Sequence, residues 1–144
     1  MVIVDASLVM KWVVREADSS VAEALLDRWM RDREVVAAPW LLVLEACNSL
    51  YQRVRRGVLS SMEAAQLAES FPAMDLLMLD TSELQGEAMR IAVRFGLPAT
   101  YDAQYLVLAS HHRCELWTAD RRLWNLTHAE ARWVRLLGEE PGAR

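Results

Sequence analysis

Four acidic residues, Asp5, Glu45, Asp102 and Asp120, stand at positions where carboxylates can do chemistry. Two of them follow short apolar runs, one opens an apolar helical stretch, and Glu45 is the single acid in a segment that otherwise has the composition of packed protein. Carboxylates that converge on one crevice repel one another and cannot all ionise without cations. If the fold brings these four together, they predict a site for a hard divalent metal ion.

Hydrolysis of a phosphate ester is the chemistry that such a site offers. Mg²⁺ takes oxygen ligands, keeps several waters and needs only one or two carboxylates. A bound ion can activate water and stabilise charge on a phosphoryl oxygen. Ser7, Asn48 and Thr118 lie within three residues of one or another of the acids, so their side chains could orient ligands or water.

Each acid taken alone also admits a structural role. Asp5 or Asp120 could simply cap the helix that follows. Glu45 is harder to explain, because a carboxylate on a buried helix face is costly unless it is paired or bound to a cation. Arg53 or Arg121 could be its partner, and that possibility stays open at the level of sequence.

Short apolar runs alternate with helical patterns along the chain, which is typical of a parallel sheet covered by helices on both faces. Ser20-x-x-Glu23 and Ser60-x-x-Glu63 predict capping boxes. Ligands bind such sheets at the carboxyl ends of the strands, where the strand order switches. The expected strands cover residues 1–4, 35–38, 75–79, 115–118 and 133–136, and the expected helices cover 6–15, 20–31, 39–56, 60–71, 82–95 and 101–110.

The chain has 144 residues, of which 53% are hydrophobic and 25% charged, the composition of one globular domain. We expect this domain over residues 1–137 and a flexible tail over 138–144. The net charge of −4 argues against a generally cationic nucleic-acid binder. No apolar run reaches the roughly 20 residues of a membrane span. Cys47 and Cys114 lack metal-type spacing and are typical of reduced thiols in a cytoplasmic protein.

Four short motifs occur in order along nearly the whole chain. They are Val4-Asp5-Ala6-Ser7 followed by Lys11-Trp12, then Glu45-x-x-Asn48, then Tyr101-Asp102-Ala103-x-Tyr105-Leu106, then Thr118-Ala119-Asp120-x-Arg122-Leu123. Together they resemble the PIN-domain family, and more closely the VapC-type toxins of bacterial toxin–antitoxin pairs. The resemblance implies an α/β fold, a three-layer α/β/α domain with a central, mainly parallel sheet of about five strands.

The resemblance also implies an activity and a site. It implies a Mg²⁺-dependent endoribonuclease, in which Mn²⁺ can substitute, with Asp5, Glu45, Asp102 and Asp120 as catalytic residues. Asp5 and Asp102 would bind the metal, and the other two would bind it directly or through water. Some relatives carry a further acid shortly after the fourth motif. Residues 121–129 contain none, which leaves the number of metal ions open.

The partners implied by the resemblance are RNA, a second copy of the chain in a homodimer, and a VapB-like antitoxin whose C-terminal segment covers the acidic groove. Arg121 and Arg122 directly follow the last acid. They could contact RNA phosphate or an antitoxin carboxylate, and a solvated pair of side chains is the alternative.

Two other classes of function have specific support or objections in the residues. A non-catalytic PIN-like module that binds RNA or protein would keep the fold without the chemistry. A receiver-like phospho-acceptor domain would use Asp80, which follows an expected strand, but it would also need an acid pair after the first strand and a late lysine, whereas the only lysine is Lys11. A haloacid-dehalogenase-like phosphatase would need an aspartate where Ser7 stands.

Overall fold

The computed structural model describes residues 1–139, and its centre is a five-stranded sheet in which every strand pair is parallel. The sequence predicted a mainly parallel sheet of about five strands, and this is confirmed. The strands are β1 (Val2–Val4), β2 (Val36–Pro39), β3 (Leu77–Leu79), β4 (Glu115–Thr118) and β5 (Val134–Leu136), in the order β3-β2-β1-β4-β5.

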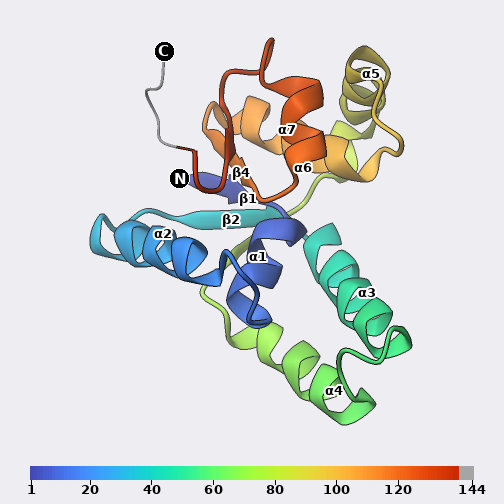
Figure 1. Ribbon diagram of the computed structural model, residues 1–144. Helices are drawn as coiled ribbons and strands as arrows, with labels where there is room; N and C mark the ends of the chain where they lie inside the picture. The colour runs from blue at the N-terminus through green and yellow to red at the C-terminus, as the bar shows by residue number, and fades with distance from the viewer. Residues whose placement is uncertain (140–144) are drawn as a thin grey trace.

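Helices cover both faces of this sheet, which gives the predicted three layers. Figure 1 shows α1 and α2 on one face and α5, α6 and α7 on the other, while α3 and α4 project away from the sheet beside α1. The helices are α1 (Ala6–Val13), α2 (Ser19–Arg31), α3 (Leu41–Arg55), α4 (Ser61–Ser70), α5 (Gln85–Phe95), α6 (Tyr101–His112) and α7 (Arg121–Thr127), with short 3₁₀ turns η1 (Phe71–Ala73) and η2 (Ser82–Leu84).

Helix α6 is the central helix that its apolar sequence predicts. Its residues 103–109 are all buried, and the helix packs across β1, β2 and β4. A helix that is apolar almost all round must be surrounded by protein. Its buried position holds its first turn, which contains Asp102, at the carboxyl edge of the sheet.

Along the chain, β2 and β3 are added on one side of β1 and then β4 and β5 on the other side, so the switch point of the strand order lies between β1 and β4. These strands pair in parallel with Val4 opposite Trp117, and the Asp5 amide donates to the Trp117 carbonyl at 3.2 Å. The first residue after β1 and the last residue of β4, Thr118, therefore lie side by side. This is the edge at which parallel α/β sheets bind ligands.

Several predicted helix starts differ from the observed ones by a few residues, and the helix expected from residue 82 begins there as the 3₁₀ turn η2 and continues as α5 from Gln85. Pro39 closes β2 and helix α3 begins at Leu41, because the parallel register continues through Pro39 opposite Leu79. The capping box expected at Ser20 does not form, and helix α2 begins one residue earlier, at Ser19. The Ser19 hydroxyl accepts from the Glu16 amide at 2.9 Å and donates to the Val14 carbonyl.

The capping box at the start of α4 is confirmed. The Ser60 hydroxyl accepts from the Glu63 amide at 3.2 Å, and the Glu63 carboxylate accepts from the Ser60 amide at 2.8 Å. The tail expected over 138–144 lies mostly outside the described residues, as 140–144 are not described. Within residues 1–139, no helix combines the length and the apolar character needed to cross a bilayer.

Candidate metal-dependent active site

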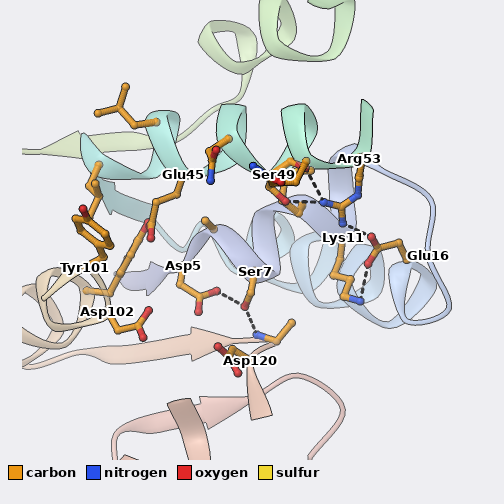
Figure 2. A pocket seen from close by; sticks show the side chains of 18 of the residues that line it. Asp5, Ser7, Lys11, Glu16, Glu45, Ser49, Arg53, Tyr101, Asp102 and Asp120 are labelled. Atoms are coloured by element: carbon orange, nitrogen blue, oxygen red, sulfur yellow. Dashed lines mark hydrogen bonds and ion pairs between the residues drawn. The ribbon is translucent and has the colours of Figure 1, made fainter. Parts of the chain in front are cut away.

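A cleft of about 810 Å³ opens at the carboxyl edge of the sheet, and all four candidate acids line it. Figure 2 shows Asp5, Asp102 and Asp120 from the sheet side of this cleft facing Glu45 from α3. They come from the residue after β1, the first half of α3, the first turn of α6 and the N-cap of α7. The fold therefore gathers side chains that are up to 115 positions apart in the sequence, from Asp5 to Asp120.

Asp5 is the most deeply placed of the four, with only 5% of its surface exposed. One carboxylate oxygen accepts from the Leu8 amide at 2.9 Å and from the Ser7 hydroxyl at 2.7 Å, and the other accepts from the Thr118 hydroxyl. Burial raises the pKa of Asp5 to about 6 despite these hydrogen bonds, and the charge of Asp102 adds to the rise. Capping α1 is thus only part of what this carboxylate does.

Ser7 and Thr118 link the two strands that flank the switch point. The Ala119 amide donates to the Ser7 hydroxyl at 2.8 Å, and the Asp120 amide donates to the Thr118 hydroxyl at 2.9 Å. Both hydroxyls donate in turn to Asp5. The pair therefore fixes the orientation of the Asp5 carboxylate and ties it to the backbone that carries Asp120.

Asp120 and Asp102 lie near the same arginine, Arg122. One oxygen of Asp120 caps α7, accepting from the Arg122 amide at 2.8 Å and the Leu123 amide at 3.3 Å. The exposed Arg122 guanidinium lies 3.7 Å from the other oxygen of Asp120 and 3.9 Å from Asp102. Burial and the charge of Asp120 raise the pKa of Asp102, and Arg122 offsets only part of this rise.

Glu45 pairs with neither Arg53 nor Arg121. Arg53 pairs with Glu16, and Arg121 lies 3.5 Å from Glu139. Glu45 accepts a hydrogen bond from the hydroxyl of Tyr105. Burial raises the pKa of Glu45, Tyr105 lowers it, and the charges of Asp102 and Asp5 raise it further.

Tyr105 is a site residue whose role the sequence did not reveal. It belongs to α6, only 1% of the residue is exposed, and its ring is part of the main hydrophobic core. A buried tyrosine needs a partner for its hydroxyl, and here that partner is Glu45 on the facing helix. Its place in the third motif was the only available signal. Asn48, one helical turn beyond Glu45, also lines the cleft.

The acids of the cleft affect one another's pKa, and this bears on whether a cation fits the site. Asp5, Glu45 and Asp102 each have a pKa raised by burial and by another acid of the set. Among residues 1–139, no group of three or more His, Cys, Asp or Glu side chains is close enough together to hold a metal ion. Mg²⁺ does not require such a group, because one or two carboxylates and several waters suffice. The all-oxygen donor set and its excess negative charge fit that ion.

Asp80, the acceptor in the receiver-like alternative, lies apart from this cleft. It follows the edge strand β3, is exposed, and accepts hydrogen bonds from the amide and hydroxyl of Ser82, both at 2.8 Å. It is not among the residues that line the acidic cleft. A phospho-acceptor aspartate needs neighbouring carboxylates to hold its metal ion. The four acids that line the cleft are not grouped with Asp80.

The family model for the PIN domain matches residues 2–128, so the chain belongs to the PIN domain family. Its relatives are VapC-type proteins. The chain is 33% identical over 113 residues to Exonuclease VapC9 of Pyrobaculum aerophilum, covering 74% of this chain and 80% of the relative. It is 31% identical over 125 residues to Ribonuclease VapC3 of the same organism, covering 84% and 90%.

Solved structures show the same fold. The crystal structure of PAE2754 from Pyrobaculum aerophilum has a TM-score of 0.67 and 28% identity, over 88% of this chain and 78% of that one. A toxin–antitoxin complex from Klebsiella pneumoniae has a TM-score of 0.62 over 97% of this chain and 100% of that one. At 16% identity, this second likeness shows the fold alone. The predicted PIN-like, VapC-type assignment is confirmed.

Proposed function

We propose that this chain is a Mg²⁺-dependent endoribonuclease and the toxin of a VapBC-like toxin–antitoxin pair. The observation that supports this most is the set of four acids, carried on four separate elements, that line one cleft at the strand-order switch; Asp5, Glu45 and Asp102 each have a pKa raised by burial and by the charge of another acid of the set. The names of the two VapC relatives, one a ribonuclease and one an exonuclease, support a nuclease.

In this proposal the chain's own residues hold and orient the reacting groups. Asp5 and Asp102 would bind the ion, and Glu45 and Asp120 would bind it directly or through its waters. The bound ion would supply a polarised water and neutralise charge on the scissile phosphate. Ser7 and Thr118 keep Asp5 in one orientation, and Tyr105 does the same for Glu45. Such supporting contacts commonly determine metal affinity.

The experiment is cleavage of a circular RNA by the purified protein, because only an endonuclease can open a circle. We expect cutting in Mg²⁺ or Mn²⁺ and none in excess EDTA. An Asp80→Asn variant should behave as wild type, because Asp80 lies outside the cleft. Equal cutting in EDTA would contradict the proposal, and cutting of linear RNA alone would replace it with an exonuclease. Tight RNA binding without any cutting would favour the non-catalytic module.

An antitoxin partner and a homodimer are part of the same proposal. The toxin–antitoxin complex from Klebsiella pneumoniae has this fold, and the acidic cleft is bordered by apolar side chains of α3, among them Leu41 and the exposed Leu44. The partner would thus meet an apolar rim around a charged site. We also expect this protein to be located in the cytoplasm together with its antitoxin.

Tyr105→Phe is expected to reduce RNA cleavage about tenfold and to weaken Mn²⁺ binding by a similar factor. The substitution removes only the hydroxyl that holds Glu45, and the buried ring still fills its place in the core. Cleavage rates and Mn²⁺ titration measure the effect. Tyr101→Phe is the matched control, because Tyr101 lines the same cleft but is 58% exposed. Equal losses in both variants would contradict a specific role for Tyr105.

A further inference from the structure

The cleft that holds the four acids has a second end with the opposite charge. Lys11, Arg53 and Arg56 line it there, and Glu16 is the single acid among them. Figure 2 shows Lys11, Glu16 and Arg53 grouped at one end of the pocket and Asp102 and Asp120 at the other. The charges are therefore segregated along one continuous cleft rather than mixed.

Glu16 neutralises only part of this positive charge. Its carboxylate accepts from the Lys11 ammonium at 2.8 Å and from the Arg53 guanidinium. Arg53 also donates to the Ser49 hydroxyl and carbonyl. One carboxylate thus lies between two cations. Asp18 adds a contact to Lys11 at 3.7 Å, but its side chain is 65% exposed, so solvent screens that charge.

Arg56 is the cation of this group that is most available to a ligand. It is exposed and stands at the C-cap of α3. Within residues 1–139 it forms no ion pair with a carboxylate. An arginine guanidinium presents a planar fork of donors that matches a phosphate. Arg56 therefore extends the positive end of the cleft without being neutralised by Glu16.

Helix α3 sets the distance between the two ends. Glu45 lies in its first half, and Arg53 and Arg56 follow after about 12 and 16 Å along the helix axis. Asn48, Ser49 and Gln52 line the cleft between them. These side chains offer hydrogen-bond donors and acceptors along the wall. A nucleic-acid strand that places one phosphate at the acidic end would bring a later phosphate to the basic end.

We propose that Lys11, Arg53 and Arg56 form a subsite for a second backbone phosphate of a single RNA strand, a few nucleotides away from the phosphate at the acidic end. This inference rests on the proposed function. It also gives a chain of net charge −4 a way to bind RNA, because three cations line the cleft itself. The cleft is of the size that holds a small ligand, which suits a short stretch of unpaired strand.

The test measures binding of a fluorescently labelled, mixed-sequence 12-nucleotide single-stranded RNA by anisotropy, in EDTA, over a range of KCl concentrations. Arg56→Gln should weaken binding about threefold. It should also make the negative slope of log K against log[KCl] less steep, by about 0.7. Arg55→Gln is the matched control, because Arg55 is exposed one residue earlier on the same helix but does not line the cleft. It should leave both quantities unchanged.

Glu16→Gln should change the affinity for RNA in the opposite direction. Removing the one acid that lines the cleft at this end should tighten RNA binding, whereas a purely structural role for Glu16 would lower the melting temperature and leave binding weaker or unchanged. If Glu16→Gln does not fold, the two arginine variants decide. Equal effects of Arg55→Gln and Arg56→Gln, or none from either, would overturn the subsite. So would an Arg56→Gln variant that loses affinity for an acidic peptide but not for RNA.

The failure of this inference can be told apart from failure of the nuclease proposal. Binding in EDTA requires neither metal nor cleavage. A protein that cuts RNA normally but shows no difference between the arginine variants keeps its proposed function and loses the subsite. A protein that binds through Arg56 but never cuts in Mg²⁺ keeps the subsite as a binding site and loses the proposed activity.

Discussion

Replacing Asp5 with asparagine is expected to reduce RNA cleavage strongly while making the metal-free protein more stable. The carboxylate is buried, and burial raises its pKa to about 6, so its charged form, which predominates at neutral pH, is less stable in the folded protein than in the unfolded chain. The amide carries no charge and can still accept from Ser7 and the Leu8 amide. We expect a gain of about 1–3 kcal/mol in the free energy of unfolding at pH 7.5, and a loss of cleavage on the order of 10²–10³-fold.

Urea unfolding in EDTA and RNA cleavage in Mg²⁺ measure these two effects of Asp5→Asn separately. Asp80→Asn is the control, because Asp80 is exposed and lies outside the cleft, and it should change neither. A variant that both loses stability and loses cleavage would mean that Asp5 serves mainly to cap α1. Unchanged cleavage would remove Asp5 from the site.

The second large effect is an unusual dependence of stability on pH. The pKa of Asp5 is raised from 3.8 to about 6 in the folded state, so the folded protein binds more protons than the unfolded chain between these values. Stability must then fall as pH rises from about 4.5 to about 6.5. The raised pKa values of Glu45 and Asp102 act in the same direction. The Asp5 contribution alone is about 3 kcal/mol.

Urea unfolding at several pH values in EDTA measures this dependence. The lowered pKa of Glu16 has the opposite effect, but it acts at pH values below about 4.5. Asp5→Asn should flatten the curve between pH 4.5 and 6.5. Added Mg²⁺ should stabilise the wild type more at pH 7 than at pH 5, because protons compete with the metal for carboxylates. Stability that rises through this interval in the wild type would contradict the raised pKa of Asp5.

The convergence of the acids could be predicted because it depends on topology. Asp5 and Asp120 follow strands, and strands of a parallel sheet end at one edge. Asp102 belongs to the first turn of a helix whose apolar sequence requires a central place. Glu45 was expected to need a partner because it stands alone among apolar residues. Sequence periodicity and the cost of buried charge are sufficient for these inferences.

The hydrogen-bond and ion-pair partners of the site residues could not be predicted, because they depend on contacts between residues far apart in the chain. Glu45 pairs with Tyr105, 60 positions later, and not with Arg53 on its own helix. Arg53 reaches Glu16, 37 positions earlier. The basic end of the cleft is missed for the same reason, since Lys11 and Arg56 lie on separate elements. Local spacing also misplaced the start of α3, where sheet pairing extends β2 through Pro39.

Calorimetric titration of Mn²⁺ into the metal-free protein tests most directly whether the gathered carboxylates form a cation site. The wild type should bind at least one ion, and Asp5→Asn and Asp102→Asn should each weaken that binding by tenfold or more, while Asp80→Asn binds as wild type does. A wild-type protein that binds no Mn²⁺ at millimolar concentration, or that binds it equally well after both substitutions, would contradict the metal-dependent site.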